Sequence, residues 1–290
     1  MAFLSYLISG LGLGSVYAII ALGYSMVYGI AKMLNFAHGD VIMIGAFAAY
    51  LSISKLNLPV FAAVILSVAV CTILGVVIER LAYKPLRQAS KLAVLITAIG
   101  VSYFLQNAAQ IVWGSDTKIF PALISGSVKL GSLSISYLTI ITICTCIAIM
   151  LVLTWFINNT KTGRAMRACS EDQGAASLMG INVNKIISIT FAIGSGLAAI
   201  AAVLLCATYP SVYPTLGSMP GIKAFTAAVF GGIGSIPGAF LGGLLLGVIE
   251  NLAKAYISTQ LSDAIVFGVL IVVLLIKPTG LLGKKMNEKV

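Results

Sequence analysis

Long apolar stretches without a charged side chain constrain this chain more than any other feature. They cover Met1–Ala31, Val41–Ser54, Leu56–Ile78, Leu92–Ser115, Leu130–Thr160 and Ile186–Ile222. Crossing the hydrocarbon core of a bilayer takes about 20 consecutive apolar residues, so the long stretches predict membrane spans. With 60% hydrophobic and 9% charged residues, the 290-residue chain is not an ordinary soluble domain.

A span in lipid must satisfy its own backbone hydrogen bonds, and helices do this within one segment. We therefore expect an all-α fold, a polytopic transmembrane helical bundle of about eight spans that include broken or re-entrant segments. Residues 1–290 are expected to form a single transmembrane domain.

One charge-free stretch, residues 224–249, does not look like a single straight span. Its interruptions are Gly231, Gly232, Gly234, Pro237 and Gly238. A single crossing here would leave the basic tail of the chain on the outer side, so we expect two half-helices or two short spans. Broken backbone at membrane depth is tolerated only inside protein or beside a cavity, so we expect these residues inside the bundle, next to a central pathway.

A second irregular element, residues 35–40, lies in the other half of the chain and contains Asn35, His38, Gly39 and Asp40. Paired interrupted segments in the two halves of a transporter point to a central pathway. His38 is the only histidine, and with Asp40 it could belong to a metal site, a proton relay or a catalytic pair. The pair offers too few ligands for a metal, so we favour capping of the next helix by Asn35 or Asp40.

Polar side chains also recur within one predicted span. Ser102, Gln106 and Gln110 are four residues apart and therefore share one face of the helix. Hydrogen bonding between helices is the interpretation that we favour for this face, and direct contact with a substrate is the alternative.

Basic residues cluster in three segments between or after the spans, at about residues 79–91, 158–185 and 277–290. Cytoplasmic loops carry the excess of Lys and Arg, so these segments, including Gln88, should be cytoplasmic and the N-terminus should lie outside. Lys118, Lys129 and Lys223 would then lie outside as a minority. The net charge of +10 is spread over short loops and forms no single soluble face, so we expect contact with membrane lipid and not with nucleic acid.

The sequence contains no constellation for chemistry. A phosphate loop of the form GxxxxGK[ST] is missing, and the five cysteines have spacings that suit neither disulfides nor a zinc site. We therefore expect neither an enzyme nor a cofactor. A self-contained secondary transporter or channel would place ionisable residues within spans, whereas Asp40, Glu250 and Asp263 lie at the ends of predicted segments.

Several motifs resemble the permease subunits of Liv-type branched-chain amino-acid ABC importers, in particular the shorter of the two inner-membrane subunits. The motifs are Asn35-Phe36-Ala37-His38-Gly39-Asp40, Ala82-Tyr83-Lys84-Pro85-Leu86-Arg87, Gly163-Arg164-Ala165-Met166-Arg167-Ala168, Leu178-Met179-Gly180-Ile181, the segment from Phe230 to Ala239, and the segment from Lys277 to Gly283. The resemblance spans nearly the whole chain.

This resemblance implies one half of a translocation pathway in a bacterial inner membrane. Its expected partners are a paralogous permease subunit, two cytoplasmic ATPase subunits and an extracytoplasmic solute-binding protein. Leucine, isoleucine and valine are the expected solutes, and urea, short amides, sugars and nucleosides are the alternatives that related permeases carry.

The resemblance also gives the second basic loop a role, because ABC importers dock a cytoplasmic helix of pattern Glu-Ala-Ala, three residues, Gly on the ATPase. Ala175, Ala176 and Gly180 fit this spacing, while Gly174 replaces the Glu. The remaining residues expected in this ATPase-coupling loop are Gly163, Arg164, Arg167, Glu171 and Asp172. A solvated connector is the alternative interpretation of the loop.

Overall fold

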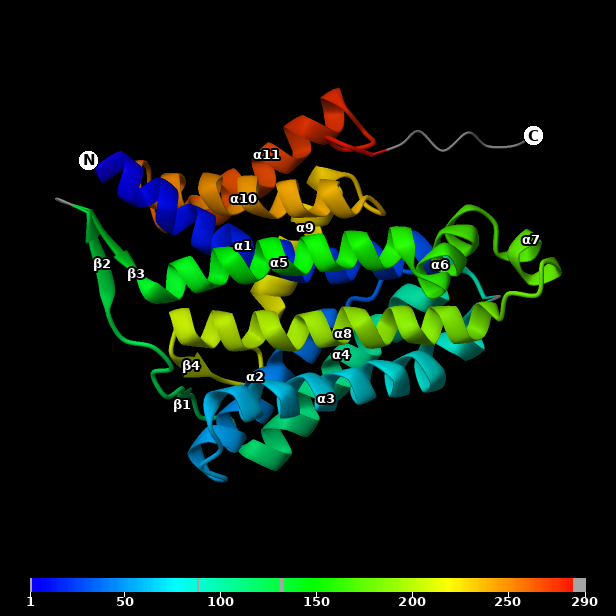
Figure 1. The fold of residues 1–290 in the computed structure, drawn as a ribbon, viewed down its shortest axis with the longest axis horizontal. Helices are drawn as coiled ribbons and strands as arrows, with labels where there is room; N and C mark the ends of the chain where they lie inside the picture. The colour runs from blue at the N-terminus through cyan, green and yellow to red at the C-terminus, as the bar shows by residue number, and fades with distance from the viewer. Residues whose placement is uncertain (1, 88, 131–132, 284–290) are drawn as a thin grey trace.

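The computed structural model describes residues 2–87, 89–130 and 133–283, which form a bundle of long helices (Figure 1). Eleven α-helices occur in these residues. Their bounds are α1 (Ala2–Ala31), α2 (His38–Ser54), α3 (Val60–Ile78), α4 (Lys91–Trp113), α5 (Tyr137–Asn159), α6 (Lys161–Glu171), α7 (Gln173–Leu178), α8 (Val183–Thr208), α9 (Ser218–Gly231), α10 (Ile236–Tyr256) and α11 (Ser262–Ile276). A π-helical turn η1 (Glu79–Tyr83) and a 3-10 turn η2 (Lys84–Leu86) extend α3.

Two small antiparallel sheets lie at the end of the bundle that holds the N-terminus (Figure 1). In one, β1 (Lys118–Ile119) pairs with β4 (Ser211–Val212), so that Lys118 lies opposite Val212. In the other, β2 (Ser127–Leu130) and β3 (Leu133–Ser136) form a hairpin just before α5.

The predicted all-α, polytopic class is confirmed. Among the described residues, six helices are long and apolar enough to cross a membrane, namely α1, α3 with its extending turns, α4, α5, α8 and α10. The shorter apolar helices α2 and α11 add two further segments. The chain is therefore a multi-pass membrane protein.

The helices alternate in direction, so the loops fall into two groups at opposite ends of the bundle (Figure 1). We call the end that holds residues 32–37, 79–87, 160–185, 232–235 and 277–283 the basic end. It carries Lys32, Arg80, Lys84, Arg87, Lys161, Arg164, Arg167, Lys185 and Lys277. Gln88 and the tail lysines from Lys284 onward lie outside the described residues.

Helix α1 packs most closely against α10, through glycines four residues apart on both helices. A Cβ atom added to Gly14 would lie 2.7 Å from the carbonyl oxygen of Leu244, and one added to Gly247 would overlap the Gly14 backbone. Glycine at these positions lets the two backbones touch, as the Gly243 and Gly247 spacing predicts. Helix α8 is largely buried and packs against α1, α2 and α3 at the core.

The charge-free stretch from Ile186 to Ile222 is not one continuous segment. Helix α8 ends at Thr208, the chain continues as extended backbone through β4, and α9 begins at Ser218. The placement of Lys223 in an outer loop was therefore wrong. Lys223 lies inside α9 and is buried, because apolar sequence without a charge hides a break between two helices.

The glycine-rich interruption at residues 231–238 is a tight turn between α9 and α10 at the basic end. Gly232 and Gly234 have φ angles of +109° and +91°, which only glycine adopts readily. The α10 that follows is 21 residues long, so the expected second half-helix is a full-length span. Ser25 of α1 holds the turn, because its hydroxyl accepts from the Gly234 N–H at 2.9 Å.

Candidate functional site

Helices α2 and α9 both begin inside the bundle and not at its ends. At the start of α2, His38 packs on Gly23 of α1, which lies eight residues before α1 ends, or about 12 Å along a helix axis. The start of α9 meets the start of α2 there. A Cβ on Gly39 would lie 2.6 Å from the carbonyl oxygen of Gly217, and one on Gly221 would lie 2.9 Å from the Gly39 Cα. We call this contact the α2–α9 junction.

A cluster of polar side chains surrounds the junction. The Gln106 amide of α4 donates to Asp40 Oδ1 at 2.8 Å, and its nitrogen lies 3.3 Å from Ser102 Oγ and 3.5 Å from Ser218 Oγ. Asp40 is buried, with 2% of its surface exposed. Gln106 therefore links α2, α4 and α9 by hydrogen bonds, which is the role that we favoured for this face of α4. Gln110, on the same face, is exposed.

Two helix N-termini meet at this carboxylate. Turn carbonyls already accept from several of the first N–H groups, as Asn35 O does from His38 and Thr215 O from Ser218. Each N-terminus still carries the partial positive charge of its helix dipole, which stabilises an anion nearby. Asp40 lies in the first turn of α2 and reaches the first turn of α9 through Gln106 and Ser218. Interrupted helices whose positive ends face the middle of the bundle form the solute sites of several transporter folds.

The predicted capping of α2 by Asn35 or Asp40 was wrong. The residue before α2 is Ala37, and no side chain caps the helix. Asn35 Oδ1 instead accepts from the Tyr83 hydroxyl at 2.9 Å, because the turn after α3 packs against it. His38 is buried edge-on against the Tyr24 ring, at 4.6 Å between centroids.

An ion cluster around the buried Glu250, which was not predicted from the sequence, joins α9, α10 and α11. Lys223 Nζ lies 2.8 Å from Glu250 Oε1 and 2.6 Å from Asp263 Oδ1, and Lys254 Nζ reaches the same Glu250 oxygen at 2.6 Å. Glu250 lies within α10 and not at the end of a segment, so the argument from segment ends was wrong for this residue. The signal was available, since an ionisable residue inside an apolar stretch almost always has a buried partner.

Helices α6 and α7 form a short helical hairpin that protrudes at the basic end (Figure 1). Each helix has an N-cap, because Thr160 Oγ1 accepts from the Gly163 N–H and Asp172 Oδ1 accepts from the Ala175 N–H, both at 2.9 Å. The inner face of α6 is fixed by Met166 and Cys169, which are buried. Burial also raises the pKa of the Cys169 thiol, so it stays neutral.

Gly180 has a local backbone role. Its φ angle is +80°, the Gly180 N–H donates to Ser177 O, and the Ile181 N–H donates to Ala176 O at 3.0 Å. This is the glycine-terminated helix ending known as the Schellman motif. Among the described residues, the space around a Cβ at Gly180 is open, so only the left-handed backbone angle opposes a side chain there.

The tip of the hairpin exposes apolar side chains to solvent, where they are available for contact with another protein. Leu178 and Met179 are 90% and 83% exposed. Behind them, the Gln173 amide donates to the carbonyl oxygen of Ile30 at 3.0 Å, near the end of α1. Leu178, Met179 and Gln173 were not singled out as site residues, because exposure and a contact across 143 residues are tertiary properties.

The residues expected at the pathway do not form one group. The structure brings Gly39, Asp40 and Gln106 together at the junction, with His38 adjacent. The expected residues of the second interruption lie at or beside the α9–α10 turn. Gly231 and Gly238 are buried there, and Gly234 and Pro237 are exposed. Gly232 packs against Gly283. Backbone N–H groups of Leu281 and Leu282 donate to Phe230 O and Gly231 O, both at 2.9 Å, and close this turn.

Comparison with known proteins decides what class of molecule holds these sites. A family described as "Branched-chain amino acid transport system / permease component" matches residues 6–274. The chain belongs to this family. It is 48% identical to the high-affinity branched-chain amino acid transport system permease protein BraD of Pseudomonas aeruginosa, over 99% of this chain and 98% of BraD. It is 47% identical to the corresponding protein LivH of Escherichia coli K12, with the same coverage.

Among solved structures, PsaBC from Streptococcus pneumoniae in complex with Fab resembles this permease in fold. The TM-score is 0.50 at 16% sequence identity, over 94% of this chain and 92% of that chain. The named relatives are transport permeases and not enzymes.

The polar cluster of the permease predicts a measurable difference between two neighbouring glutamines. Gln106→Leu removes the 2.8 Å donor of a buried carboxylate, which should cost about 1.5–3 kcal/mol. Gln110→Leu changes an exposed residue one turn further along α4 and should change stability by less than about 0.5 kcal/mol. Thermal unfolding of the purified variants in detergent measures both, and equal shifts would contradict the interhelical role of Gln106.

Proposed function

We propose that this permease forms half of the translocation pathway of an ATP-binding-cassette importer for leucine, isoleucine and valine. The observation that carries the proposal is the 48% identity, over almost the full length of both chains, to a relative named for high-affinity branched-chain amino acid transport. The near-complete coverage of both chains supports a common arrangement of helices. The proposed partners are a paralogous permease subunit, two cytoplasmic ATPase subunits and an extracytoplasmic solute-binding protein.

In this proposal the α2–α9 junction, with Asn35, His38, Gly39, Asp40 and Gln106, borders the pathway. Broken helices that begin inside the bundle form the solute sites of several other transporters, which supports this placement. Next to the junction, Met219 and Ile222 of α9 are exposed and apolar, which suits a branched aliphatic side chain. The α9–α10 turn, with Gly231, Gly232, Gly234, Pro237 and Gly238, would fix where α9 ends.

The α6–α7 hairpin is the proposed ATPase-coupling element, since the chain lacks a phosphate loop of its own. Its proposed residues are Gly163, Arg164, Arg167, Glu171, Asp172, Ala175, Ala176 and Gly180, to which the structure adds Leu178 and Met179. Exposed apolar side chains at the tip would fill a cleft on the ATPase, and Gln173 would transmit movement to α1 through Ile30. Gly180 would shape the helix end and not fill the cleft.

We further propose that the basic end faces the cytoplasm and that the N-terminus lies outside, in a bacterial inner membrane. The concentration of Lys and Arg at one end of the bundle supports this orientation. The described part of the tail, up to Gly283, lies at the same end.

The solute specificity can be tested on the assembled complex in proteoliposomes. Solute-binding protein loaded with leucine, isoleucine or valine should stimulate ATP hydrolysis and uptake of the labelled amino acid, whereas urea or ribose should do neither. In the same assay Ile222→Glu should lose uptake while assembly is retained, because a charge would stand beside the proposed path of an apolar side chain. Stimulation by urea or ribose and not by leucine would refute the proposed solute.

Docking of the hairpin can be tested with Leu178→Glu. A charge at the centre of a fitted apolar contact should cost about 2 kcal/mol, or about thirtyfold in affinity for the ATPase. Recovery of ATPase on the purified permease should fall, together with uptake. The matched control is Leu261→Glu, which places the same charge on an exposed leucine at the opposite end of the bundle. Unchanged ATPase recovery for Leu178→Glu would show that the hairpin is a solvated connector and does not dock on the ATPase.

Orientation can be tested with single cysteines in a Cys144→Ser background, because Cys144 is the exposed cysteine among the described residues. A cysteine at Gly174 should react with an impermeant maleimide only after the membrane is opened. A cysteine at Ser125, which is exposed near the opposite end, should react in intact cells. The reverse pattern would invert the proposed topology.

A further inference from the structure

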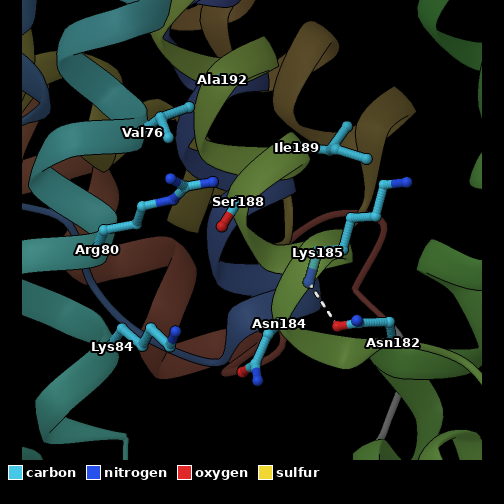
Figure 2. Close-up of a pocket in the computed structure, with 9 residues that line it drawn as sticks. All are labelled: Val76, Arg80, Lys84, Asn182, Asn184, Lys185, Ser188, Ile189 and Ala192. Carbon is cyan, nitrogen blue, oxygen red and sulfur yellow. Dashed lines mark hydrogen bonds between the residues drawn. The ribbon is translucent and has the colours of Figure 1, made fainter.

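A cavity of about 530 Å³ opens at the basic end between the turns that follow α3 and the start of α8 (Figure 2). Arg80 and Lys84 lie on one side of α8, and the Lys185 side chain extends along the other side (Figure 2). These three cationic side chains are exposed to solvent and together give the hollow a positive potential that attracts an anion.

Within the described part of the chain, none of these three cations has a carboxylate within 4 Å, since they are missing from its ion pairs. Glu79 precedes Arg80 in the chain, but its carboxylate is buried and already has partners. It pairs with Arg87 and accepts from the Ser188 hydroxyl at 2.6 Å. The cavity therefore presents net positive charge.

The cavity also contains hydrogen-bond donors. Helix α8 begins at Val183, so its first N–H groups and its positive dipole end lie at the cavity. Asn182 Oδ1 accepts from the Lys185 N–H at 3.0 Å, and Asn184 Oδ1 accepts from Arg87. Both amide oxygens are used, which leaves the amide NH₂ groups as donors toward an anion.

The surroundings indicate what kind of anion fits. Toward the membrane interior the wall becomes apolar, with Val76, Ile189 and Ala192 half-buried. On α3, Ile73 and Val77 are exposed and four residues apart, so they form one apolar face next to the cavity. A ligand that is anionic at one end and apolar at the other matches both parts, whereas free phosphate or an acidic peptide matches only the first.

We propose that this cavity binds the phosphate headgroup of an anionic phospholipid, with the acyl chains along α3. Basic pockets between membrane helices at a cytoplasmic surface bind such headgroups. The bound phosphate would pair with Arg80, Lys84 and Lys185 and join the turn η1 to the start of α8. This inference concerns lipid and is independent of which solute the permease carries.

The test is native mass spectrometry of the purified full-length chain with added lipid. Phosphatidylglycerol should bind more tightly than phosphatidylcholine of identical chains, because only the first has net charge. The double variant Arg80→Gln with Lys185→Gln should weaken phosphatidylglycerol binding about tenfold or more. Each basic residue near the membrane surface adds to the binding free energy of an anionic lipid. Lys84→Gln alone should give a smaller loss in the same direction.

A matched control removes the same charge elsewhere at the basic end. Lys32→Gln with Lys161→Gln changes two exposed lysines outside the cavity and should leave lipid binding within about twofold. Equal losses in the two double variants would show diffuse attraction and overturn the proposal. Displacement of the lipid by millimolar inorganic phosphate would identify a free-anion site instead. Unchanged lipid binding with reduced recovery of ATPase would identify a protein contact instead.

Discussion

The backbone contact between Gly39 and Gly217 is the constraint on which the rest of the interior depends. Two helices can begin inside a membrane bundle only if their free N–H groups find partners there. Here the turn carbonyls of Asn35, Ala37 and Thr215 accept from the first N–H groups, and the missing Cβ atoms let the two starts touch. Gln106 then joins the two starts by hydrogen-bonding the side chains of Asp40 and Ser218. Remaining helices, above all α1 and α8, close around this point.

Charged side chains around Glu250 inside the bundle are paired with opposite charges, whereas most of those at the basic end are exposed to solvent. Glu250 is fully buried, but Lys223 and Lys254 both contact it, so two opposite charges offset its desolvation. Lys223 also pairs with Asp263, so this cluster joins α9, α10 and α11. At the basic end most cations, including Lys161 and Arg164, are exposed to solvent and contribute little to stability. These cations instead favour one orientation of the chain in the membrane and are available for contacts with lipid and partner subunits.

Several site residues were predictable from sequence for a physical reason. Asp40 and Gln106 are polar residues in or next to apolar stretches, where an unpaired polar group is costly, so a buried partner could be expected. The partner itself could not, because 66 residues separate the two. Gly180 was recognised by its spacing, but its left-handed backbone, which determines its role, is visible only in the structure.

The sequence by itself determined the solvent, the helical class and the approximate spans, because each depends on runs of apolar residues that the chain carries locally. Only the tertiary structure decided that α8 stops at Thr208, that α9 starts beside α2 and that Lys223 is buried. Apolar sequence does not record where a helix breaks inside a bundle. That choice depends on backbone approach and on pairing between distant residues, which exist only once the helices have packed.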